Sequence, residues 1–134
     1  MQKMHVIELK KGQEVISALH EYLMEKQWKS AIFYTALGSL KDVLVSNPVS
    51  ETVPPELRFT EINDLCEVVS FVGEISRKSD NPNQVLPCVI ANSPSDYVVH
   101  CHMACSHGDG QVFGGGLRRA TILRALNIYA IVEE

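Results

Sequence analysis

The chain has 134 residues and a mass of 14.9 kDa, enough for one compact domain, residues 1–134, with a sizeable buried core. Its hydrophobic fraction of 46% and charged fraction of 21% are those of an ordinary globular protein. The net charge of −4 excludes the overall basic surplus typical of domains that bind DNA tightly through phosphate contacts.

The first part of the chain predicts a strand followed by a helix. Met4–Leu9 has strand character, and no apolar stretch near the N-terminus is long enough for a signal peptide or a membrane span. Across Gln13–Lys26 apolar residues recur at helical spacing, at Ile16, Leu19, Tyr22 and Leu23. We therefore expect a cytoplasmic protein without membrane partners, whose early helix packs its apolar stripe on a sheet.

The pattern then changes to strands. Ala31–Leu37 is a continuous apolar run of the kind buried in a sheet. Gly38-Ser39 predicts a turn that leads into a partner strand at Asp42–Ser46. Pro48–Pro55 is predicted to be a loop because its prolines exclude regular structure.

Further strands are expected in the second half of the chain. Cys66–Ser76 is a strand candidate, in which Gly73 indicates a bulge or a close backbone approach. The polar segment Arg77–Gln84 is predicted to be a loop, and Leu86–Ala91 and Tyr97–Ala104 are predicted to be two strands. These assignments place most of the chain in a sheet.

The C-terminal segment is ambiguous by local pattern alone. The stretch LRRATILRAL (Leu117–Leu126), which overlaps the start of Arg119–Val132, fits a helix, whereas Ile128–Val132 is rich in residues that favour strands. One early helix and many later strands predict an α+β fold with mixed or antiparallel pairing.

The stretch Val98–Leu117, VVHCHMACSHGDGQVFGGGL, concentrates the candidate chemistry. Residues two apart in a strand face the same way, so His100 and His102 are expected to project together. Two imidazoles can share one ion, but catalytic zinc needs a third protein ligand. His107, His5 or an imidazole of a neighbouring subunit could supply it. One hypothesis is therefore zinc or another divalent metal at His100, His102 and His107; the other is a polar cleft without metal.

Three glycines, Gly114, Gly115 and Gly116, are followed closely by Arg118 and Arg119. A phosphate-binding loop would follow a strand, open a helix and carry a lysine, and this segment has no such lysine. A tight backbone crossing or a subunit contact is the favoured explanation. Guanidinium groups nevertheless suit carboxylate and phosphate, which makes the glycines and Arg118 candidate ligand-binding residues. The alternative for the arginines is a solvated surface pair.

The four cysteines contain no C-x-x-C motif and are expected to be thiols rather than disulfides. Cys66, Cys88 and Cys101 lie in apolar segments, where a thiol behaves as a small buried hydrophobe. Cys105 lies near His107, but a nucleophile pair also needs an orienting group, so a core or edge thiol is favoured. No catalytic residue is identified, and a non-enzymatic role is favoured.

Several short motifs follow one another along nearly the whole chain. They are Lys11-Gly12-Gln13-Glu14, Ala36-Leu37-Gly38-Ser39-Leu40, the strand Glu67–Ile75, His100-x-His102, and Asp109-Gly110-Gln111-Val112-Phe113-Gly114-Gly115. In this order they resemble the PPC domain, the plant and prokaryote conserved domain, in its stand-alone prokaryotic form.

The resemblance implies a compact α/β sandwich with one main N-terminal helix, in which Thr121–Val132 is mostly strand. It also implies homotrimers with sites near the subunit contacts. In metal-binding members a third histidine ends a G-G-H motif; here that position is Gly116, so the ligand set is one short. Glu67 matches a recurrent family position and is expected to line the histidine cleft or to form a salt bridge across subunits.

Three functions follow as hypotheses. The resemblance implies a DNA-associated regulatory or interaction protein, whose partners are itself and DNA or DNA-binding proteins. Because the chain has no R-G-R-P AT-hook core and no basic tail, its own DNA affinity is expected to be weak. The alternative is a small-molecule- or metal-binding protein that uses the histidine and glycine cleft. The third is a purely structural oligomerisation domain.

Overall fold

The computed structural model describes residues 2–80 and 87–134, with only the backbone described for Gln2, Pro87 and Cys88. The elements follow in the order β1 (Gln2–Lys10), α1 (Val15–Lys26), β2 (Ser30–Pro48), β3 (Leu57–Ile62), β4 (Cys66–Arg77), a short 3-10 turn (Lys78–Asp80), α2 (Pro87–Ala91), β5 (Tyr97–Ser106) and β6 (Val112–Glu133). All strand pairs are antiparallel within this part of the chain. The predicted α+β class with a helix near the N-terminus is confirmed.

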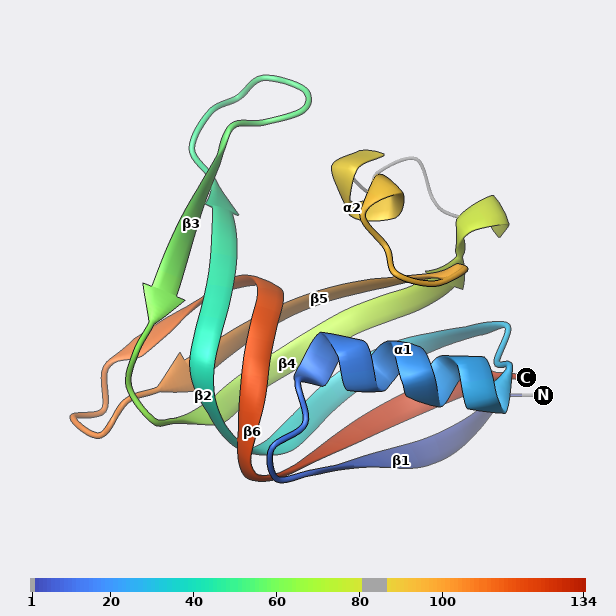
Figure 1. The fold of residues 1–134 in the computed structure, drawn as a ribbon, viewed down its shortest axis with the longest axis horizontal. Helices are drawn as coiled ribbons and strands as arrows, with labels where there is room; N and C mark the ends of the chain where they lie inside the picture. The colour runs from blue at the N-terminus through green and yellow to red at the C-terminus, as the bar shows by residue number, and fades with distance from the viewer. Residues whose placement is uncertain (1, 81–86) are drawn as a thin grey trace.

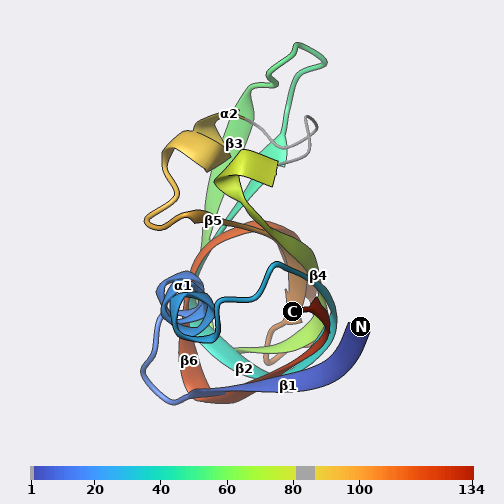
Figure 2. The same ribbon diagram turned by 90° about the vertical axis from the view of Figure 1, so that its right-hand side faces the viewer.

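The sheet closes on itself. Strands β2, β4, β5 and β6 pair in a cycle, because β6 pairs with both β5 and β2. Figure 2 shows this ring end-on, with β1 added outside β6. Strand β3 pairs with the last part of β2, and the two form an arm that extends away from the ring (Figure 1).

Helix α1 packs against β6 and β5 and buries one face in the core, including Val15, Leu19 and Leu23. It begins at Val15 because the Glu14 side chain accepts hydrogen bonds from the first free backbone N–H groups. It ends at Gln27, which adopts a left-handed conformation with φ 55°. The helix predicted over Gln13–Lys26 is therefore confirmed within two residues at its start. No helix within the described ranges is long and apolar enough to cross a membrane.

The predicted turn at Gly38-Ser39 is wrong, because β2 runs continuously through it from Ser30 to Pro48. A Cβ atom at Gly38 would overlap the carbonyl oxygen of Ala125 and lie 2.8 Å from the Cα atom of Leu126. The glycine therefore marks a close crossing of β2 and β6 at a β-bulge, where the register shifts between Gly38 and Leu40.

The strand predicted at Leu86–Ala91 is also wrong over residues 87–91, the part of it that the structure describes. Pro87–Ala91 forms the short helix α2. Proline is favoured in the first turn of a helix, where its missing N–H group leaves no hydrogen bond unmade. Leu86 lies outside the described residues, as does the end of the loop predicted over Arg77–Gln84.

The C-terminal segment is strand, as the family resemblance implies. Strand β6 covers Val112–Glu133 and includes the whole of Thr121–Val132. Its inward side chains alternate with less buried ones and are almost fully enclosed, at Ile122, Leu126, Ile128, Ala130 and Val132. Burial on the strand period explains why local helix propensity does not decide this segment.

Candidate functional site

His100 and His102 lie together on the outer face of β5, as strand alternation predicts. The intervening and following residues, Cys101 and Met103, are buried on the inner face. The two imidazole rings have centroids 5.0 Å apart and meet edge to face. On the neighbouring strand β4, a carboxylate oxygen of Glu74 lies 3.7 Å from Nδ1 of His100. The site therefore begins as a histidine pair with one carboxylate beside it.

Gly116, where the resemblance expects a third histidine, pairs directly with His102 between β5 and β6. A Cβ atom at Gly116 would lie 3.4 Å from two oxygen atoms of Ser46 and 4.0 Å from Cδ2 of His102. This position has room for a side chain, which would start beside the His102 ring. The strand is therefore in place beside His102, and the third imidazole is missing only because residue 116 is glycine.

His107 lies apart from this pair. Its Nδ1 atom is 2.8 Å from a carboxylate oxygen of Asp64, and its ring packs on Phe113 with centroids 4.7 Å apart. His5 also lies apart from the pair, on β1, with Nε2 3.3 Å from a carboxylate oxygen of Glu134. Within residues 2–80 and 87–134, no group of three or more His, Cys, Asp or Glu side chains is placed to hold a metal ion. The set of His100, His102 and His107 is therefore not assembled within one chain.

Glu67 lies beside His107 and not in the cleft of the other two histidines. It pairs with Ser106 and lines, with His107, a separate cavity of about 370 Å³. A register shift between Val68 and Ser70 places Glu67 and Glu74 on the same outer face of β4, although they are seven residues apart. Strict strand alternation puts them on opposite faces, so the bulge is the reason that the sequence does not reveal Glu74.

Arg118 completes the polar part of the cleft. Its Nε–H group donates a 2.8 Å hydrogen bond to Oγ of Ser46, and its guanidinium lies 5.7 Å from the centroid of the Phe59 ring. It lines one cavity of about 240 Å³ together with His100, His102 and Gly116. By contrast, Arg119 points to another partner, Glu61, at 3.6 Å.

The cleft contains a positive charge beside a histidine that resists protonation. Burial, then the neighbouring His100, then Arg118 lower the pKa of His102 below its ordinary value. At neutral pH the His102 ring is therefore neutral and keeps a nitrogen lone pair that can accept a hydrogen bond or bind a cation.

The first two glycines of the triplet are required by packing. A Cβ atom at Gly114 would overlap the carbonyl oxygen of Met103 on β5. A Cβ atom at Gly115 would lie 2.6 Å from the side-chain nitrogen of Asn47 on β2. The triplet lies within β6, between these two strands, so the predicted tight backbone crossing is confirmed.

The cysteines are placed in the core. Cys66, Cys101 and Cys105 are free thiols and buried, as expected, while the side chain of Cys88 lies outside the described residues. The interaction with the neighbouring Cys66 side chain lowers the pKa of Cys105 to about 7, against the burial that raises it. Because Cys105 is fully enclosed, this thiol is not placed to attack a bound molecule.

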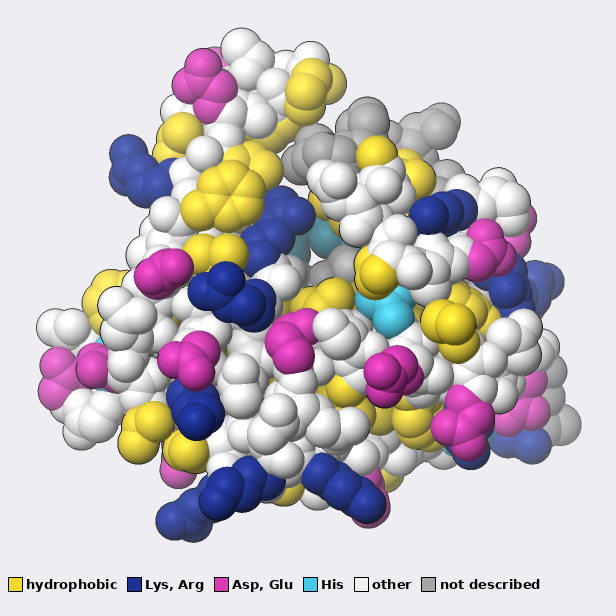
Figure 3. All heavy atoms as spheres, in the orientation of Figure 1, with side chains coloured by type: hydrophobic (Ala, Val, Ile, Leu, Met, Phe, Trp, Pro, Cys, Tyr) yellow, Lys and Arg dark blue, Asp and Glu magenta, His cyan; other side chains and the backbone are white. Residues whose placement is uncertain are grey.

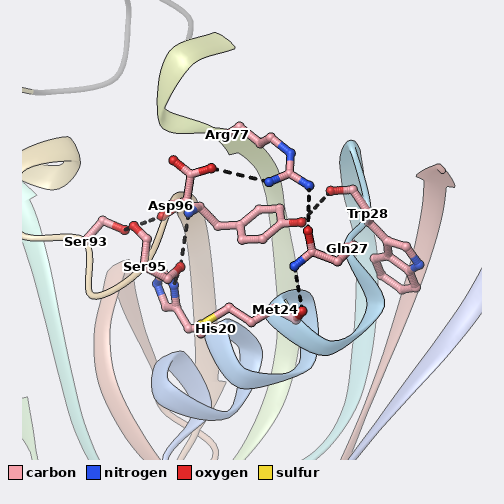
Figure 4. A network of polar contacts seen from close by, with 9 residues as sticks. His20, Met24, Gln27, Trp28, Arg77, Ser93, Ser95 and Asp96 are labelled. Carbon is pink, nitrogen blue, oxygen red and sulfur yellow. Dashed lines mark hydrogen bonds and ion pairs between the residues drawn. The ribbon is translucent and has the colours of Figure 1, made fainter.

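A second polar network braces the start of β5 against α1 (Figure 4). Nδ1 of His20 lies 2.6 Å from Oγ of Ser95, and the Tyr97 hydroxyl donates a 2.7 Å hydrogen bond to the carbonyl oxygen of Trp28. Burial and the nearby charge of Lys78 lower the pKa of His20, so this ring is neutral at neutral pH. The network holds His20 and Ser93 in place, and both line a cavity of about 340 Å³ that Arg118 also lines.

The model of the Plants and Prokaryotes Conserved (PCC) domain matches residues 1–134. The chain belongs to this family. The PPC domain identified from the sequence motifs is thereby confirmed over the whole chain. No curated protein matches the sequence.

Solved structures show the same PPC fold. A PPC protein of Pyrococcus horikoshii has a TM-score of 0.76 at 18% identity, over 98% of this chain and 80% of that one. A metal-containing protein of Archaeoglobus fulgidus has a TM-score of 0.75 at 22% identity, over 98% and 80%. A structure from Bacteroides thetaiotaomicron, described as a "putative dna binding protein", has a TM-score of 0.70 at 17% identity, over 98% and 78%. At these identities the similarity establishes the PPC fold alone.

Proposed function

We propose that the protein is a self-associating PPC module: one domain spanning residues 1–134 that forms a homotrimer and takes part in DNA-associated regulation or interaction. An exposed apolar face on the outside of the sheet carries this proposal. The family supports self-association as its role, and the face supplies a surface on which identical copies could pack.

The outer face is continuous across three strands. Met4 on β1 pairs with Ile131 on β6, which in turn pairs with Ile32 on β2. On β2, Ile32, Tyr34 and Leu37 are 52%, 55% and 64% exposed. The face continues through other exposed apolar side chains, Val6, Val69 and Val72. Apolar patches of this kind mark interaction surfaces because burying them against a partner removes apolar area from water.

The candidate cleft borders this face. Ile32 pairs with Glu74 on β4, and Glu74 pairs with His100 on β5. A further cavity of about 270 Å³ is lined by Ile32, Val72, Glu74 and both histidines. Copies packed on the apolar face would therefore lie at the edge of the cleft, in keeping with a site near a subunit contact.

Ile32→Glu is expected to convert the trimer to monomers, because each copy would carry a carboxylate into a dry interface at a cost of several kcal/mol. Light scattering coupled to size exclusion measures the change in mass. The matched control is Val53→Glu, since Val53 is 96% exposed and lies in the loop beyond β2, away from the face. Equal masses for both variants and the native protein would argue against this interface.

DNA association is proposed at low intrinsic affinity. The family and the neighbour described as a "putative dna binding protein" support the association. The net charge is −4, and Figure 3 shows Lys and Arg side chains interspersed with Asp and Glu on the visible face. Positive side chains are not concentrated on such a surface, so it can neutralise few DNA phosphates at once.

For a duplex of about 30 base pairs, we expect a dissociation constant near 100 µM at about 150 mM salt, the weak end of the non-specific range of roughly 10⁻⁴–10⁻⁶ M. Fluorescence anisotropy across a salt series measures it. Binding tighter than about 1 µM at that salt concentration would show that the protein recognises DNA autonomously.

The cleft supports a second candidate function, ligand binding. Within the described residues, no carboxylate lies within ion-pair distance of the Arg118 guanidinium. The described part of one chain does not fit zinc, because no third His, Cys, Asp or Glu side chain there is placed to join His100 and His102 on one ion. A metal would need a further ligand from a neighbouring subunit, so we favour an organic ligand.

A further inference from the structure

Two cavities meet at Arg118. One, of about 340 Å³, includes Ile16 and His20 of α1 in its lining, and the other, of about 240 Å³, contains His100 and His102. Both are lined by the same central residues, Leu57, Val89, Val99, Leu117 and Arg118. Figure 3 shows the hollow between the β2–β3 arm and α2, with blue and cyan side chains inside it. We call this continuous space the Arg118 groove.

Among residues 2–80 and 87–134, no acidic side chain forms an ion pair with Arg118. Arg118 is half-buried, and the partners that the structure gives it are neutral: the hydroxyl of Ser46 and the ring of Phe59. The other arginines that flank this region are paired, Arg119 with Glu61 and Arg77 with Asp96. A half-buried charge without a partner is unfavourable, so this guanidinium favours an anion that enters the groove.

The rest of the lining selects the kind of anion. The shared walls are aliphatic, from Leu57, Val89, Val99 and Leu117, and suit a hydrocarbon body. Arg118 is the one Lys or Arg side chain among the described residues that line the two cavities. One guanidinium balances a monoanion and presents a planar fork that matches a carboxylate, whereas a phosphate dianion would keep one charge uncompensated.

We propose that the Arg118 groove binds a small organic acid, with its carboxylate on the Arg118 guanidinium and its hydrocarbon body against Leu57, Val89, Val99 and Leu117. The proposal rests on the ligand-binding candidate function given above and names the chemical class of its ligand. It is independent of DNA association.

Hexanoate tests the proposal, with hexanamide as its uncharged match and inorganic phosphate as a charged probe without an apolar body. Titrations of the full-length protein are followed by two-dimensional NMR of its backbone amides. We expect hexanoate to bind at least tenfold more tightly than hexanamide, with shifts centred on Val99, Leu117 and Arg118. Phosphate is expected to produce no saturable shifts there.

Two variants assign the charge. Arg118→Gln is expected to weaken hexanoate at least tenfold and to leave hexanamide unchanged, and Arg118→Lys is expected to keep part of the affinity because it keeps the charge. The matched control is Arg119→Gln, which removes the neighbouring guanidinium that pairs with Glu61 and should bind hexanoate as the native protein does. Amide spectra of each variant report whether its fold is intact.

The outcomes separate this inference from the ligand site itself. Equal binding of hexanoate and hexanamide, or hexanoate binding that survives Arg118→Gln, would overturn the carboxylate class and leave the groove as an apolar ligand site. Phosphate binding that depends on Arg118, without hexanoate binding, would also overturn it. If none of the three probes binds in the groove, both the inference and the ligand-binding function fail.

Discussion

Gly38→Ala is expected to destabilise the protein by about 3 kcal/mol, the upper part of the usual range for overpacking a core. The added methyl group would overlap the carbonyl oxygen of Ala125 and crowd the Cα atom of Leu126, and both are backbone atoms of β6. Neither atom can rotate aside as a flexible side chain could. Strands β2 and β6 must therefore move apart at the pairing that closes the ring of strands.

Urea unfolding measures this effect at one protein concentration, so that self-association contributes equally to each variant. With a dependence near 1.5 kcal/mol per molar urea, the midpoint should fall by about 2 M. Gly108→Ala is the matched control, because a Cβ atom there meets nothing within 4 Å. Coinciding midpoints for the two variants would contradict the close crossing at Gly38.

Gly116→His is expected to create a zinc site where the native chain has two histidines. The new side chain would start beside the His102 ring, in a position with room for it. A third imidazole completes the set of protein ligands typical of catalytic zinc. Zinc affinity should rise by more than the roughly 100-fold that a change in the outer shell of a site can cause.

Competition with a chromophoric chelator, together with elemental analysis of tag-free protein, measures that gain. We expect about one zinc per chain in Gly116→His and substoichiometric zinc in the native protein. Gly116→Ala controls for the added Cβ atom. The double variant Gly116→His/His102→Ala should lose the gained zinc; if it does not, the new histidine is not binding where the strand pairing places it.

Local pattern predicts the features that depend on one strand at a time. Alternation along β5 places His100 and His102 on the same face and Cys101 opposite, and the structure agrees. The motif order identifies the family, and through it the strand character of Thr121–Val132, against a local pattern that also fits a helix. These successes rest on period-two burial and on residues close in sequence.

The failures arise where strands distant in sequence meet. Gly38-Ser39 has the residue types of a turn, but glycine is needed at 38 because the backbone of Ala125 on β6 comes so close. Glu74 reaches the site because a bulge shifts the face of β4, and that bulge depends on pairing with β5. His107 follows β5 directly, yet Asp64 draws it toward a different cavity. None of these partners can be read from spacing along the chain.

The Arg118 groove also depends on strands that are distant in sequence, because the β2–β3 arm supplies part of its lining. Leu57 and Phe59 come from a segment that the sequence leaves between a proline-rich loop and the next strand. Pairing with the end of β2 carries them over Arg118 and turns an exposed arginine into a half-buried one. From the sequence, Arg118 is a candidate anion-binding residue, whereas the apolar walls that we propose as the selecting surface appear only in the fold.

The mass of the native protein in solution tests the central claim of self-association most directly. Light scattering on the tag-free chain at low micromolar concentration should give about three times the chain mass of 14.9 kDa, independent of dilution over a tenfold range. A mass equal to one chain throughout that range would contradict the claim and leave the apolar outer face without the partner we propose for it.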